Sequence, residues 1–200
     1  MPAPLQNAID RLDQLGRISD SPSYLVRTFL SPANRKAAGK VLEWMAVLGM
    51  EVSHAPDGTV RGILPGSNPT AAPLLLGSHI DTVIDAGKYD GALGIIAALA
   101  AIETLQQEKT TLPFPVHLLA FSDEEGTRFQ TTYLGSRGVI ASLDPASITA
   151  LLAKSKEAAA SSLDLQNATL SGYDPLGLAR GALSIMSGGG DMSAAGLALV

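Results

Sequence analysis

The fold of this chain is decided by residues 73–107, which read PLLLGSHIDTVIDAGKYDGALGIIAALAAIETLQQ. The short apolar run at 73–79 is typical of a buried strand, and residues 91–107 predict a strongly apolar helix that must be largely buried. A second apolar run, Val116 to Phe121, indicates another buried strand after that helix. Strands that alternate with helices in this way indicate an α/β layered fold with a mixed, mostly parallel sheet.

The residues on either side of this stretch predict further elements at helical and strand spacing. They are helices over 3–16 and 33–48, strands over 50–54 and 59–64, and a turn or helix from residue 133. Ser31 followed by Pro32 is typical of a helix start, because serine caps the first turn and proline suits its first position. Asp57 and Gly58 form a hairpin turn signal between the two strands.

Composition restricts the classes of protein that fit. The 200 residues are 46% hydrophobic, which is enough for one ordinary domain, and the formal net charge of -5 comes with no basic cluster. No cysteine is present, which excludes disulfides and thiolate metal sites. The first residues lack the apolar segment of a signal peptide, and the longest apolar stretch, 92–102, is too short to span a bilayer. We therefore expect a cytoplasmic protein that binds neither nucleic acid nor membrane.

Side chains that suit a metal ion follow both buried strands. His79 comes directly after the first strand, and Asp81 is placed to accept a hydrogen bond from the second ring nitrogen of that histidine. Asp90 stands immediately before the buried helix, where a carboxylate could bridge two ions, and Gly91 allows a close backbone approach. An imidazole with carboxylates is a ligand set of hydrolytic sites that use a divalent metal.

Glu124 and Glu125 are adjacent after the second buried strand. Neighbouring side chains point in different directions, so one glutamate can bind a metal while the other faces water as a general base. Each feature alone is more often a surface histidine, an Asp-Gly turn or an acidic helix start, but their conjunction favours a metal site. Arg128 and Gln130 follow closely and are candidate substrate contacts, although Arg128 could equally pair with a nearby carboxylate.

Five segments carry a family resemblance. They are 27–33 (RTFLSPA), 77–83 (GSHIDTV), 87–94 (GKYDGALG), 121–129 (FSDEEGTRF) and 132–137 (TYLGSR). With them the chain resembles the N-terminal part of the M20 metallopeptidase-related amidohydrolases. Within these it is most similar to the branch of allantoate amidohydrolases, N-carbamoyl-L-amino-acid hydrolases and β-ureidopropionases. The resemblance covers residues 5–140, and residues 141–200 match weakly, so residues 1–200 are expected to form a single partial catalytic domain.

The resemblance implies a three-layer, zinc-peptidase-like catalytic domain and assigns a role to each candidate residue. His79, Asp90 and Glu125 would be metal ligands, with Asp90 bridging two ions of Zn²⁺ or Mn²⁺. Glu124 would be the general base, and Asp81 would orient His79. The implied reaction is hydrolysis of a linear amide or ureido C–N bond in a small-molecule substrate, with release of ammonia. Members of this branch are typically homodimers.

The sequence departs from the family in its histidines. The family takes two further histidine ligands from later in the chain, whereas this sequence contains only His54 and His117 besides His79. We therefore expect weak metal affinity and low turnover from these 200 residues alone. Two alternatives stay open: a peptidase or aminoacylase of the M20 group, and a truncated metal-binding fragment without catalytic activity.

Overall fold

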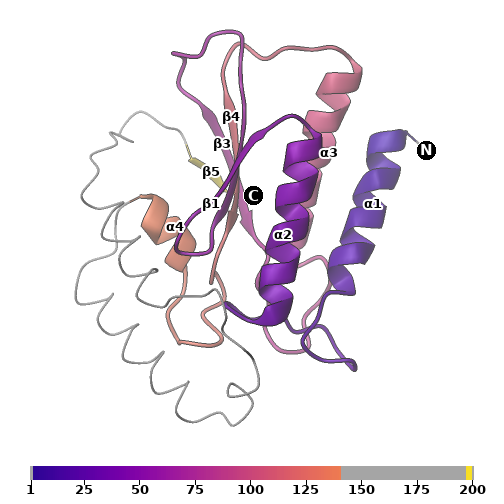
Figure 1. Cartoon of the computed structure of the whole chain (residues 1–200), viewed down its shortest axis with the longest axis vertical. Coiled ribbons are helices and arrows are strands. Elements are labelled where there is room, and N and C mark those ends of the chain that lie inside the picture. The colour runs from indigo at the N-terminus through magenta and orange to yellow at the C-terminus, as the bar shows by residue number, and fades with distance from the viewer. Residues whose placement is uncertain (1, 141–196, 200) are drawn as a thin grey trace.

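The computed structural model describes residues 2–140 and 197–199, and the expectation for residues 141–200 falls almost wholly outside them. The described chain forms one mixed sheet with helices on both of its sides (Figure 1). In chain order the elements are α1 (Ala3–Gly16), α2 (Pro32–Val47), β1 (Glu51–His54), β2 (Val60–Leu64), β3 (Leu74–His79), α3 (Ala92–Gln107), β4 (Val116–Phe121), α4 (Leu134–Val139) and β5 (Leu197–Leu199). Apart from β5, each of them falls where the sequence predicts an element.

The strands are arranged in the order β1-β2-β4-β3-β5. The pairs β1–β2 and β2–β4 are antiparallel, whereas β4–β3 and β3–β5 are parallel. The expected mixed sheet is confirmed, but parallel pairing does not predominate among the described strands. In the register of the central parallel pair, His79 lies opposite Phe121, so β3 and β4 end at the same edge of the sheet. The loops that carry the candidate metal ligands therefore leave the sheet side by side.

Helices lie on both faces of the sheet. α2 packs on β1 and β2, α3 packs on β3 and β4, and α1 lies outside against α3. Figure 1 shows α4 on the opposite side of the sheet, where it contacts β4. The core between the sheet and its main helical layer is apolar and fully buried at Val41, Met45, Ile96 and Leu118. Its burial is the main force that holds the strand ends in place.

Two helix starts confirm local expectations. The Ser31 hydroxyl accepts a hydrogen bond from the Asn34 amide at 3.0 Å and caps α2, as the Ser-Pro pair predicts. Gly91 caps α3 with a φ of 62°, a backbone conformation that suits glycine. A Cβ at residue 91 would lie 2.5 Å from the His79 carbonyl oxygen. Gly91 therefore lets the start of α3 approach the candidate ligand closely.

Among the residues that the structure describes, no helix is both long enough and apolar enough to cross a bilayer.

Candidate metal centre

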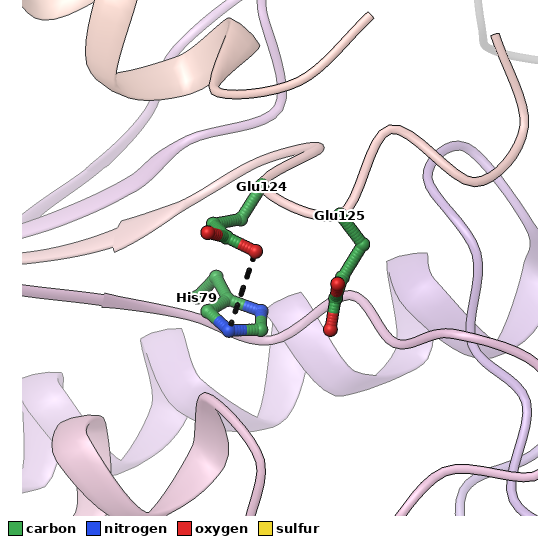
Figure 2. Close-up of side chains that lie close together, drawn as sticks. All are labelled: His79, Glu124 and Glu125. Carbon is green, nitrogen blue, oxygen red and sulfur yellow. Dashed lines mark ion pairs between the residues drawn. The ribbon is translucent and has the colours of Figure 1, made fainter. Parts of the chain in front are cut away.

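One imidazole and two carboxylates converge where the two central strands end. His79 is the last residue of β3, and Glu124 and Glu125 lie in the turn that follows β4. Ligand atoms of all three side chains lie within 4.8 Å of one another. Figure 2 shows both glutamate side chains extending toward the imidazole, and His79 Nε2 lies 3.8 Å from Glu124 Oε2. Such a group has the composition and spacing to hold a divalent metal ion.

Asp90 approaches the same imidazole from the loop before α3. Its Oδ1 lies 3.6 Å from His79 Nε2, and its side chain is about half exposed, at 49%. It is outside the compact group formed by His79 and the two glutamates. The structure thus places Asp90 beside the histidine at the open, solvent-facing side of the cluster.

A hydrogen bond to the main chain fixes the orientation of the imidazole. His79 Nδ1 lies 3.0 Å from the backbone carbonyl oxygen of Asp81, which can only accept, so Nδ1 carries the proton. The Asp81 carboxylate is further away, with Oδ1 at 3.6 Å from Nδ1. The sequence points to the right residue, but the hydrogen bond goes to its main chain. This contact leaves Nε2 facing Asp90 and Glu124.

The Asp81 carboxylate binds the other loop instead. Its Oδ1 accepts the Glu124 amide and its Oδ2 accepts the Glu125 amide, both at 3.2 Å. Asp81 is 1% exposed, so these bonds form where water does not compete. One carboxylate therefore fixes the main chain under both glutamates.

The charges of this cluster favour a cation. Burial opposes protonation of His79, yet hydrogen bonds to Asp81 and the charges of Asp81 and Glu124 outweigh it and raise the pKa of the imidazole to about 9. Burial and the charge of Asp90 raise the pKa of Glu125 above its ordinary value, although His79 opposes this. Carboxylates crowded around one imidazole repel one another, so bound positive charge would stabilise them. The residues present therefore fit a divalent ion.

Asp123 is a residue of this loop that the sequence did not single out. It is 1% exposed, has a φ of 48°, and its Oδ2 has no hydrogen-bond partner in the described structure. Burial and the charge of Asp81 raise the pKa of Asp123 to about 7, against the opposing influence of Arg128 and the Gly126 amide. The sequence signal for Asp123 is its position two residues after β4 and immediately before the two glutamates.

The two candidate substrate contacts lie further along the same turn. Arg128 Nη1 donates to the Phe29 carbonyl oxygen at 3.1 Å, and its guanidinium lies 5.4 Å from the centroid of the Phe129 ring. The direct contacts of Arg128 are thus a carbonyl oxygen and an aromatic ring, while the charges of Asp20 and Asp123 act on it from further away. Gln130 is exposed.

The remaining histidines lie elsewhere. His54 is on the edge strand β1, with Nε2 3.2 Å from the Gly58 carbonyl oxygen. His117 lies on β4 with Nδ1 3.1 Å from Arg61 Nη2, and burial followed by the charge of Arg61 lowers its pKa. The centre therefore contains a single imidazole from this sequence.

A mixed sheet that presents a histidine and carboxylates at the ends of its central strands is typical of hydrolases that use a divalent metal. The chain belongs to the family described as Peptidase family M28, whose model matches residues 59–174, more than half of its length. The sequence motifs resemble those of the M20-related amidohydrolases, in the branch of allantoate and N-carbamoyl amino acid hydrolases. Relatives with these two activities confirm that similarity.

Three relatives define the branch. Allantoate deiminase 1 of Glycine max is 48% identical over 140 residues, which cover 69% of this chain and 29% of that protein. The N-carbamoyl-L-amino acid amidohydrolase of Geobacillus stearothermophilus is 34% identical over 136 residues, 68% of this chain and 33% of that protein. The crystal structure of a hydantoinase/carbamoylase family amidase from Burkholderia ambifaria superposes with a TM-score of 0.66 at 29% identity, covering 69% of this chain and 34% of that one. The chain thus spans about a third of the length of these relatives.

Proposed function

We propose that this chain carries part of the active site of a metal-dependent amidohydrolase that cleaves ureido C–N bonds. The observation that supports this most directly is the convergence of His79, Glu124 and Glu125 at the ends of β3 and β4. The named activities of the relatives, which act on allantoate and N-carbamoyl amino acids, supply the substrate class.

In this proposal His79, Asp90 and Glu125 hold the metal, as the family resemblance implies. The buried imidazole offers Nε2, and Asp90 is the carboxylate at the open side, where it can be shared between two ions of Zn²⁺ or Mn²⁺. A divalent ion held there would act as a Lewis acid that polarises the scissile carbonyl group and makes water a better nucleophile. Asp81 keeps the proton of His79 on Nδ1 through its backbone carbonyl.

Glu124 is the proposed general base. Its side chain is 32% exposed, so the carboxylate faces the cluster while remaining accessible to water and substrate. It would take a proton from the attacking water as the water oxygen bonds to the carbonyl carbon. The C–N bond then breaks and Glu124 returns the proton to the leaving nitrogen, which balances the hydrolysis.

The substrate would be a small molecule with a terminal ureido group, such as allantoate or an N-carbamoyl amino acid. Arg128 and Gln130 are proposed to lie near its path, and the active assembly is proposed to be a cytoplasmic homodimer, as is typical of the branch. The two additional histidine ligands of the family have no counterpart in this sequence. We therefore expect weak metal binding and slow turnover from these residues alone.

The test measures metal content and ammonia release by the purified chain with Zn²⁺ or Mn²⁺. We expect slow release of ammonia from allantoate or N-carbamoyl amino acids, and no cleavage of dipeptides or N-acetyl amino acids. Glu124→Gln should retain the metal and lose the activity, whereas Glu108→Gln, at an exposed position after α3, should change neither.

Three other results would change the conclusion. Cleavage of dipeptides or N-acetyl amino acids without ammonia release would favour a peptidase or aminoacylase. Bound metal without any turnover would favour a non-catalytic metal-binding fragment. Full activity in Glu124→Gln would contradict the assignment of the base.

A further inference from the structure

Arg27 is a buried cation that none of the proposed catalytic roles uses. It is 1% exposed and opens the first of the family-like segments, between α1 and α2. Its Nε donates to the Ile80 carbonyl at 2.7 Å, and its Nη1 donates to the carbonyls of Leu15 at 2.7 Å and Ile18 at 3.0 Å. The guanidinium thus joins the end of α1 to the loop that leaves β3.

The backbone of Arg27 holds the same loop at a second point. Its amide donates to Thr82 Oγ1 at 2.8 Å, and its carbonyl accepts the Thr82 amide at 3.1 Å. Ile80 and Thr82 are the two neighbours of Asp81. Arg27 therefore forms hydrogen bonds with the residues on both sides of Asp81. Asp81 in turn forms hydrogen bonds with His79 and with the main chain of both glutamates.

Arginine has the geometry that these contacts require. Its planar guanidinium presents several donors in a fixed fork, whereas lysine offers a compact charge on a flexible stem. Burial lowers the pKa of Arg27 to about 10, while the charges of Asp81 and Asp20 oppose the change. The side chain therefore stays charged at neutral pH and adds positive charge behind the acidic cluster.

We propose that Arg27 is a positioning residue of the metal centre: by fixing residues 80 and 82 it sets the place of Asp81, and through Asp81 the orientation of His79, Glu124 and Glu125. This inference rests on the proposed function, because it assumes that these side chains hold a metal. Arg27 itself contacts neither metal nor substrate.

The test compares Arg27→Lys, which keeps the charge but not the fork, with Val41→Ala, a core change on α2 away from the centre. Co²⁺ is the probe, because its visible spectrum reports ligand geometry. Arg27→Lys should alter the Co²⁺ spectrum and weaken binding by about 10- to 100-fold, the usual cost of losing an outer support of a metal ligand. Val41→Ala should lower Tm and leave the spectrum and the affinity unchanged. An unaltered spectrum and affinity in Arg27→Lys would overturn the proposal.

Amide hydrogen exchange in the metal-free chain separates this inference from the proposed function. Arg27→Lys should accelerate exchange at the Glu124 and Glu125 amides more than Val41→Ala does, when each variant is measured equally far below its own Tm. If the wild-type chain bound no metal, the proposed function would fail, and this measurement would decide the role of Arg27. If Arg27→Lys did not fold, Thr82→Val, which removes the acceptor of the Arg27 amide, would take its place. Equal exchange at both amides in the variant and the control would overturn the inference.

Discussion

The Asp81 carboxylate holds the main chain of Glu125 across the sheet edge, with Oδ2 accepting the Glu125 amide at 3.2 Å over a sequence separation of 44 residues. The other oxygen of the same carboxylate accepts the Glu124 amide. Both carboxylate oxygens are thus engaged by the loop after β4, while the Asp81 carbonyl oxygen accepts a hydrogen bond from His79 Nδ1. The two candidate ligand loops therefore form one unit.

Asp81→Asn should damage that unit. An asparagine side chain has one oxygen acceptor and one NH₂ donor group. One of the two glutamate amides would therefore lose its acceptor, and its N–H would face the NH₂ group. Because the site is buried, we expect the free energy of unfolding to fall by about 1–3 kcal/mol. Metal affinity should fall by about 10- to 100-fold. Denaturant unfolding and metal titration measure the two effects.

The matched control is Asp85→Asn, which makes the same change at an exposed residue of the loop after β3 with a φ of 57°. Asparagine tolerates this backbone conformation, so stability and metal affinity should both stay close to wild type. An Asp81→Asn variant that behaved like this control would contradict the bracing role of the carboxylate.

Gly91→Ala should disturb His79 directly. The backbone at residue 91 has a positive φ, and the new Cβ would lie 2.6 Å from His79 Nδ1 and 2.5 Å from its carbonyl oxygen. We expect a loss of at least about 1–2 kcal/mol, the usual cost of a left-handed conformation for a residue with a side chain. Metal binding should weaken as well. Thermal unfolding and metal titration check both.

Gly39→Ala provides the opposite outcome with the same substitution. Gly39 lies inside α2, and a Cβ there would meet nothing within 4 Å. Removing glycine from a helix interior should stabilise the chain by about 0.5–1 kcal/mol and leave metal binding intact. Stabilisation by both alanines would contradict the close approach inferred at Gly91.

The fold was largely predictable because its elements are coded locally. The apolar run before His79, the apolar helix after Gly91 and the Ser31–Pro32 helix start each specify their element within a short window. Which strands pair depends on contacts distant in sequence, so local patterns did not show that two of the four pairings among the described strands are antiparallel. The antiparallel insertion of β2 beside β4 and the pairing of residues 197–199 with β3 have no such local signal.

The candidate site was predictable in its residues but not in its bonds. Spacing placed His79 and the two glutamates at strand ends, and the shared edge of β3 and β4 brings them together. The spacing could not show that His79 bonds to the Asp81 carbonyl, because that choice depends on how the loop turns. It also could not reveal Arg27, whose partners lie on α1 and after β3.

Asp123→Asn should stabilise the chain in a way that depends on pH. The pKa of Asp123 is raised from an ordinary 3.8 to about 7, so the folded state holds a proton that the unfolded state releases between these values. Stability contributed by that proton is complete below pH 3.8 and falls as pH rises to about 7, by at most about 1.4 kcal/mol per pH unit. Asparagine is neutral throughout and suits the φ of 48°.

The advantage of Asp123→Asn should therefore grow from pH 4 to pH 7 and stay constant above it. Urea unfolding of the metal-free chain at several pH values measures the difference, with the exposed Asp10→Asn on α1 as the control. A difference that did not change with pH would show that burial does not keep Asp123 protonated.

His79→Gln should remove a second pH dependence, at higher pH. The pKa of His79 is raised from an ordinary 6.5 to about 9, since Asp81 and Glu124 stabilise the imidazolium despite its burial. In the metal-free chain this contribution to stability is complete below pH 6.5 and is lost as pH rises through about 9. The stability difference between wild type and His79→Gln should shrink over that window, as measured by urea unfolding at pH 6, 7.5 and 9.5. The control is His54→Gln on the exposed edge strand, whose free energy of unfolding should change with pH as that of wild type does. If the stability of His79→Gln also changed with pH as that of wild type does, the acidic cluster would not hold a proton on His79.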